Sequence, residues 1–165
     1  MEYYIDGHNL IPKISGISLT DDNDENELLE RLQEFSRLSR RKCTVFFDKA
    51  PDNSTREKSY GTLRVINVTH HTKADEEIIA RINKIGRTRA AEITVVTSDR
   101  HVQWQCRQAG AAVMESDKFA SEMNSLFSSG TVRTIKGNRK PKIEPKLSSK
   151  EVEAWLEIFS EKPKN

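Results

Sequence analysis

Acidic side chains follow three short apolar runs of this chain, and acidic side chains can bind metals. The runs are Tyr3–Asp6, Thr44–Asp48 and Ile93–Asp99. One aspartate at the end of a strand is commonly a turn former or a helix cap. Three of them on parallel strands would lie at one edge of a sheet, where open α/β folds bind their ligands. We therefore interpret Asp6, Asp48 and Asp99 as one site.

A further acidic cluster, Asp75-Glu76-Glu77, begins a predicted helix. A helix N-terminus favours negative charge whatever its function, and for Glu77 we prefer that explanation. Asp75 is the candidate that could join the strand-end aspartates, with Glu76 as a weaker one. Four carboxylates close together would repel one another and raise one another's pKa.

A divalent cation would remove this repulsion. Mg²⁺ or Mn²⁺ prefers oxygen ligands and can bridge to the phosphates of a substrate. Such a metal polarises a phosphoryl oxygen and activates a water molecule for attack. The residues that we expect to bind the metal and to be catalytic are Asp6, Asp48, Asp75 and Asp99.

Other kinds of site find no support in the sequence. There is no Walker A loop and no GxGxxG motif. Cys43 and Cys106 have no metal-binding spacing, which fits free thiols in a reducing cytosol. No stretch approaches the ~20 apolar residues of a membrane span. We expect a cytoplasmic protein without membrane contact, and the sequence does not specify its oligomeric state.

Predicted strands and helices that mostly alternate would position these aspartates. The strands are apolar runs, which favours a parallel sheet covered on both faces. Right-handed crossovers then give a three-layer open parallel sheet, an α/β fold of the Rossmann type. The site requires the first strand to be central, flanked by the second and the fourth. Residues 49–62 read as a long loop, and the predicted strands are residues 2–6, 44–48, 63–68, 93–97 and 111–114.

The charge distribution divides the chain into three parts. Residues 1–130, the predicted catalytic domain, hold 18 Lys/Arg and 20 Asp/Glu. Residues 131–147 read as a basic extended arm, and residues 148–165 as an amphipathic helix with a tail. Cations near phosphates release counterions, so the arm fits a nucleic-acid partner about as well as it fits a solvated linker.

Four motifs in order resemble the NYN domain family of PIN-like nucleases. They lie within about residues 2–127, and each is weak alone, whereas four in register are fairly specific. Within that family, the chain resembles the bacterial YacP-type proteins, which include ribosome-associated messenger RNA endonucleases. The motifs are Asp6-Gly7-His8-Asn9-Leu10-Ile11, Val45-Phe46-Phe47-Asp48, Ala74-Asp75-Glu76-Glu77-Ile78 and Thr97-Ser98-Asp99-Arg100.

The resemblance implies a PIN-like fold with the first strand central and metal-dependent cleavage of RNA. It implies the same four aspartates as the acidic set, with Asn9 orienting Asp6 or touching the substrate. His8 departs from the family, where a tyrosine is common, and is expected to line the cleft. We expect RNA, in a ribosome-associated setting, as the partner. The candidate substrate-binding residues are His8, Asn9, Arg100, Lys136, Arg139 and Lys140.

Two alternatives stay open on the sequence. The first is a non-catalytic RNA- or ribosome-binding module with the same fold. Its carboxylates would then repel phosphate without a metal to compensate. The second is a hydrolase of the same fold that acts on DNA or on small phosphoesters.

Overall fold

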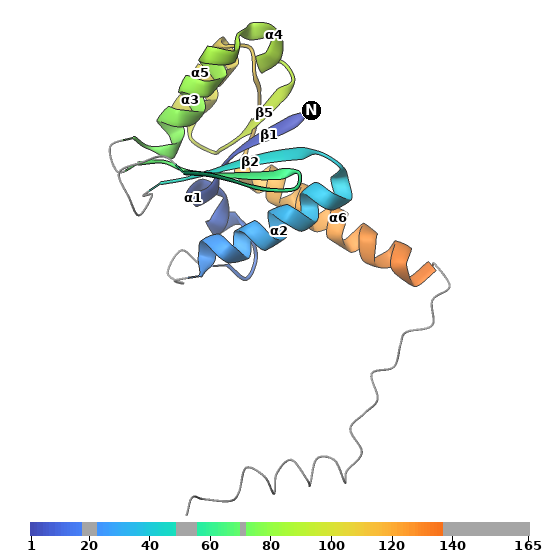
Figure 1. The fold of residues 1–165 in the computed structure, drawn as a ribbon. Coiled ribbons are helices and arrows are strands. Elements are labelled where there is room, and N and C mark those ends of the chain that lie inside the picture. The colour runs from blue at the N-terminus through green and yellow to red at the C-terminus, as the bar shows by residue number, and fades with distance from the viewer. Residues whose placement is uncertain (18–22, 49–55, 70–71, 137–165) are drawn as a thin grey trace, which may run out of the picture. The chain divides into compact units, whose positions relative to one another are not determined.

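The computed structural model describes residues 1–17, 23–48, 56–69 and 72–136, with side chains as far as residue 129 (Figure 1). The chain divides into two compact units, Met1–Thr131 and Val132–Asn165. The first unit contains the sheet and all the contacts discussed below.

A mixed sheet of six strands forms the centre of the first unit, in the order β3-β4-β2-β1-β5-β6. β1 pairs in parallel with β2 on one side and with β5 on the other. β3 pairs antiparallel with β4 at one edge. The strands are β1 (Glu2–Asp6), β2 (Lys42–Phe47), β3 (Arg56–Tyr60), β4 (Leu63–Asn67), β5 (Ile93–Val96) and β6 (Ala112–Met114).

Helices cover both faces of the sheet and complete three layers. In Figure 1, α1, α2 and α6 lie on one side of it, and α3, α4 and α5 on the other. The helices are α1 (Gly7–Leu10), the 3₁₀ helix η1 (Ile11–Lys13), α2 (Asp24–Ser39), α3 (Ala74–Ile85), α4 (Arg87–Ala90), α5 (Arg100–Gln108) and α6 (Ser116–Lys136).

Alternating side chains of the strands divide the core between these two faces. Tyr3 and Ile5 of β1 pack in the cluster that includes Phe35 of α2 and Phe119 of α6. Tyr4, between them in sequence, packs in the opposite cluster with Ile78 of α3. Successive side chains of a strand point to opposite faces, so an apolar strand can fill both cores.

The predicted α/β class and its layered sheet are confirmed, with one correction. Residues 56–60, interpreted from sequence as part of a long loop, form the antiparallel strand β3. All five of its residues are exposed, so no apolar alternation marks it. The sheet is therefore mixed rather than wholly parallel.

The last described helix continues past the end of the first compact unit, which is at Thr131. α6 extends to Lys136, so the first residues of the predicted extended arm are helical. Residues 137–165, with the rest of the arm and the predicted amphipathic helix, lie outside the described residues. Within the described part of the chain, no helix has both the length and the apolar character to cross a membrane.

Candidate active site at the carboxyl edge of the sheet

The strand register brings the ends of three parallel strands to one edge. Asp6, the last residue of β1, is in register with Phe46 of β2, and Asp48 follows one residue after that strand ends. β5 pairs with the other side of β1 and ends at Val96, shortly before Asp99. The predicted aspartates therefore share the carboxyl edge of the sheet.

Asp6 is the most perturbed carboxyl group of this edge. One of its oxygens accepts a hydrogen bond from the backbone N–H of Asn9 at 3.2 Å, and the other accepts one from the Thr97 hydroxyl at 3.4 Å. Burial raises the pKa of Asp6 to about 6, and the negative charges of Asp48 and Asp75 also raise it. The Asn9 hydrogen bond opposes this rise. Asp6 can therefore exchange a proton near neutral pH.

Gly7 allows α1 to pack closely against β2 directly after Asp6. A Cβ atom at this position would lie 2.3 Å from the ring of Phe47 and 3.0 Å from the backbone oxygen of Phe46. Phe47 is fully buried, so its ring cannot easily give way. The glycine of the Asp-Gly-His-Asn motif is thus a packing requirement that brings α1 against β2.

His8 lies between two carboxylates. Its Nε2 is 3.3 Å from Glu25, and its Nδ1 is 3.8 Å from Asp48 and forms no hydrogen bond. The hydrogen bond to Glu25 raises the pKa of His8, burial lowers it, and the charges of Glu25, Asp48 and Asp6 raise it further, for a net increase. His8 therefore lies beside acidic residues of this edge, and its expected role in lining a cleft stays a prediction.

Asp48 connects the end of β2 to the start of α3. Its Oδ1 accepts a hydrogen bond of 2.6 Å from the backbone amide of Ala74. Asp75 is the next residue of the helix, and its Oδ1 accepts from the Glu76 amide at 2.8 Å. Asp48 therefore caps a helix that begins 26 residues later and holds Asp75 at the same edge.

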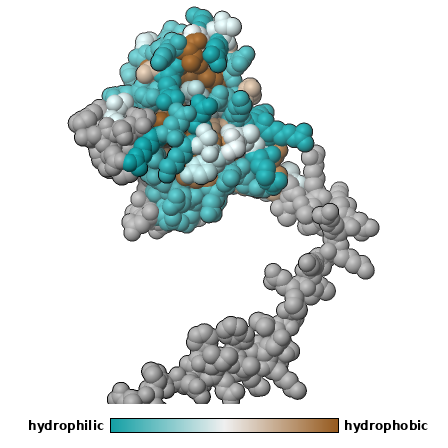
Figure 2. All heavy atoms as spheres, viewed as in Figure 1, coloured by the Kyte–Doolittle hydropathy of each residue, from teal (hydrophilic) through white to brown (hydrophobic). Residues whose placement is uncertain are grey.

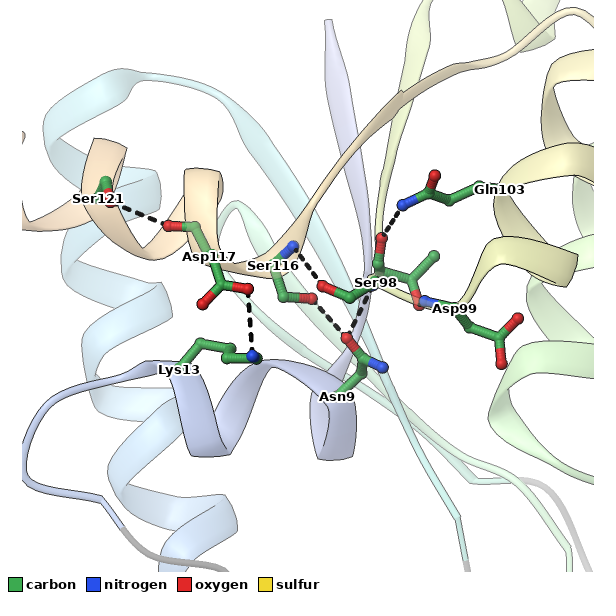
Figure 3. Close-up of polar contacts among 9 residues, drawn as sticks. Asn9, Lys13, Ser98, Asp99, Gln103, Ser116, Asp117 and Ser121 are labelled. Atoms are coloured by element: carbon green, nitrogen blue, oxygen red, sulfur yellow. Dashed lines mark hydrogen bonds and ion pairs between the residues drawn. The ribbon is translucent and has the colours of Figure 1, made fainter.

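The Asn9 side chain joins three segments of the chain (Figure 3). Its side-chain oxygen accepts hydrogen bonds from the Ser98 amide at 2.8 Å and from the Ser116 hydroxyl at 2.6 Å. The Ser98 hydroxyl in turn accepts from the Ser116 amide at 3.2 Å. The ends of α1, β5 and α6 nearest the site are fixed to one another by this network.

Asp99 has a structural task. Its Oδ1 accepts hydrogen bonds from the amides of His101 at 2.7 Å and Val102 at 3.1 Å, so it caps α5. In Figure 3 its carboxylate points away from Asn9 and Ser116. In the described ranges, no three His, Cys, Asp or Glu side chains are grouped closely enough to hold a metal ion.

Of the predicted substrate-binding cations, the structure describes the side chain of Arg100 and not those of Lys136, Arg139 and Lys140. Arg100, at the start of α5, is exposed beside Asp99. Lys136 is the last residue of α6, and its side chain is not described. Arg139 and Lys140 lie outside the described residues. Sequence reasoning gave no individual role to Glu25, Thr97, Ser98 or Ser116. Ser116 stands directly at a helix start, which is a recognisable capping signal.

Comparison with known proteins assigns this chain to a family. The model of the YacP-like NYN domain matches residues 3–160, so this chain belongs to that family, as its motifs predicted. The chain is similar in structure to Rae1 (YacP) from Bacillus subtilis, with a TM-score of 0.67 and 21% identity over 96% of this chain and 92% of the other.

A second structure, of a mutant form of the same Bacillus subtilis protein, gives a TM-score of 0.66 at 20% identity, covering 85% of this chain and 86% of that one. At these identities the likeness establishes a shared fold. A comparison with curated proteins gave no match.

Proposed function

We propose that this protein is a metal-dependent endoribonuclease that hydrolyses phosphodiester bonds of RNA. The observation that carries the proposal is Asp6, a partly buried carboxyl group whose pKa is raised to about 6 by desolvation and by the charges of Asp48 and Asp75. Stability alone gives no reason to bury a carboxyl group among like charges, whereas a cation site does. Membership of the NYN family supplies the nuclease chemistry.

The chemistry of the donor atoms is the kind that a hard divalent cation prefers, and the side chains would have to move closer together to hold one. Asp6, Asp48 and Asp75 offer only oxygen atoms, and Asp48 and Asp75 each have one carboxylate oxygen engaged by a backbone amide. We propose that these three, with the remaining oxygen of Asp99, bind Mg²⁺ or Mn²⁺. When bound, the metal supplies Lewis-acid activation of the phosphoryl group and of water.

The neighbouring residues would position the RNA. The Asn9 side-chain oxygen is occupied by Ser98 and Ser116, which leaves its amide nitrogen as the group that can donate to a phosphate oxygen. His8, held beside Asp48, would line the cleft and contact the substrate. We assign backbone contacts to Arg100 and, beyond the described side chains, to Lys136, Arg139 and Lys140.

The setting of the reaction follows from the same family. We propose that the substrate is messenger RNA in the cytoplasm, cleaved in association with the ribosome. The motifs of the YacP-type proteins support this setting, and no membrane component is part of the proposal.

A cleavage assay tests the function. Purified protein is incubated with end-labelled single-stranded RNA, and with translating ribosomes, in Mg²⁺, in Mn²⁺ and in EDTA. We expect cleavage that EDTA abolishes and that Asp6→Asn lowers at least about 100-fold. The matched control is Glu92→Gln, which removes one charge near Ile93, at the opposite end of β5, and should leave the rate unchanged.

The same assay separates the alternatives. RNA binding that needs no metal and is unchanged in Asp6→Asn, without any cleavage, would replace the nuclease by a binding module. DNA of identical sequence cut as fast as RNA would make the protein a general phosphodiesterase.

A further inference from the structure

The outer face of α5 carries an exposed aromatic side chain whose position the proposed chemistry does not explain. Trp104 is 57% exposed, one of the most exposed large hydrophobic side chains in the described residues. Its helix begins directly after Asp99, at the candidate active site, and leads away from it. An exposed aromatic ring on a helix that begins at the candidate site offers a flat surface on which a nucleic-acid base can stack.

Helical geometry places Trp104 at the centre of this face. At about 100° per residue, the exposed Arg100 and Arg107 lie roughly 40° and 60° from it on one side. The exposed Gln108 and His101 lie roughly 40° and 60° away on the other side. The residues that anchor the helix on the core, Val102 and Cys106, are fully buried on the opposite side. The core therefore does not need Trp104.

The charge of the face favours an anionic partner. α5 contains no Asp or Glu, and its exposed face carries two arginines and a histidine. Among the described residues, no carboxylate pairs with Arg100 or His101, and the side-chain contact found for Arg107 is a hydrogen bond of 3.4 Å to Gln103. The two arginines of this face therefore remain available to an incoming partner.

We propose that this face of α5, formed by Arg100, His101, Trp104, Arg107 and Gln108, binds single-stranded RNA that extends from the active site. A base of the RNA stacks on Trp104, and Arg100 and Arg107 contact phosphates. Aromatic side chains interleaved with cations are the usual platform for unpaired bases, because every base has a π-face to stack. The proposal deepens the proposed function, since it takes the substrate to be RNA.

Tryptophan fluorescence tests this directly. The chain has two tryptophans, and Trp155→Phe leaves Trp104 as the single emitter. Titration with a single-stranded RNA of about 12 nucleotides in EDTA should quench the emission, and a duplex of the same sequence should not. If Trp155→Phe fails to fold, the difference in emission between wild type and Trp104→Phe reports the same signal.

Affinity provides the second measurement. Trp104→Ala should weaken binding of the 12-nucleotide RNA by about 5- to 150-fold, the range expected for one stacked base, and Trp104→Phe by less. Arg107→Gln should reduce the dependence of log K on log salt by about 0.7, the value for one phosphate contact on a single strand. The folded state should tolerate Trp104→Ala, because the side chain is exposed.

Three outcomes decide between the proposals. Unchanged RNA affinity in Trp104→Ala, with cleavage intact, would overturn the α5 proposal and leave the nuclease standing. RNA binding that depends on Trp104, without any metal-dependent cleavage, would support the α5 proposal and overturn the nuclease proposal. If Trp104→Ala alters sedimentation of the free protein and not its RNA affinity, the face is a protein contact and the RNA proposal fails.

Discussion

The two sides of Asp6 are built from different chemistry. On the β2 side lie charged groups that are not fully hydrogen-bonded to one another. His8 Nδ1 is 3.8 Å from Asp48 and forms no hydrogen bond, and Asp75 adds another negative charge. On the β5 side lie neutral groups that satisfy one another, with Asn9 accepting two hydrogen bonds of 2.8 and 2.6 Å. The hydrogen bonds of the neutral side join α1, β5 and α6 to one another, whereas the charged side is where we propose that the metal binds.

Asn9→Ala should have the largest effect on stability, because it breaks the neutral side. Ser116 is fully buried, and its hydroxyl would lose its acceptor together with the Ser98 amide. We expect a loss of about 2–3 kcal/mol, the cost of leaving such groups unsatisfied. Urea unfolding measures it. Asn9→Asp keeps the acceptor oxygen and is the control; equal loss in both variants would argue against the hydrogen-bond explanation.

Adding metal should stabilise the charged side by a comparable amount. A cation that binds only the folded state adds about 2.7 kcal/mol at 100 times its Kd. Thermal unfolding at pH 8 should therefore shift upward with Mn²⁺ or Mg²⁺ in wild type and far less in Asp6→Asn. The same shift in both proteins would place the bound cation elsewhere.

Asp6→Asn should make the metal-free protein more stable at pH 8. The pKa of Asp6 is about 6 in the folded state against 3.8 for the ordinary group, so the folded state binds more protons between those values. Stability then falls as pH rises through this window. A shift of about two units corresponds to about 3 kcal/mol, reduced by screening, so we expect a gain of about 1–3 kcal/mol.

The pH dependence provides the check on Asp6→Asn. Unfolding free energies of the variant and the wild type should differ most above pH 7 and converge towards pH 4, where protonation of Asp6 removes most of the buried charge. A gain that stays constant from pH 4 to pH 8 would mean that charge burial is not its cause.

His8→Asn should have the smallest effect, because the His8 side chain is partly exposed. The folded state raises the pKa of His8, chiefly through the Glu25 hydrogen bond, so protonated His8 adds stability below the unfolded pKa of about 6.5. That contribution disappears as pH rises through the folded pKa. We expect less than about 1 kcal/mol at pH 6 and less still at pH 8.5, measured by denaturation at both values.

The features that depend on short-range sequence patterns, above all the positions of the buried strands, were predicted correctly. Apolar runs that end in Asp6, Asp48 and Asp99 marked the strands, and parallel pairing then brings their ends to one edge. For Asp99 the helix-cap explanation also holds, because it caps α5. Its role as a metal ligand stays a prediction.

Long-range partners were beyond the reach of sequence reasoning. The contacts of Asn9 with Ser98 and Ser116 join residues 89 and 107 positions apart, and Asp48 caps a helix 26 positions away. Such pairs depend on how the layers close, which no local spacing encodes. β3 was not predicted for a local reason, because a fully exposed strand shows no alternation of apolar and polar residues.

The exposed strand β3 has a consequence for how copies of this protein behave together. An outer strand offers unpaired backbone groups to any other strand, and can therefore start aggregation. β3 begins Arg56-Glu57-Lys58, and Glu57 is tied to Arg64 at 3.2 Å and to Arg81 at 3.8 Å. Figure 2 shows hydrophilic side chains over much of this face of the molecule. An approaching strand would have to desolvate these charges, so this fully exposed strand protects its own edge of the sheet from pairing with another molecule.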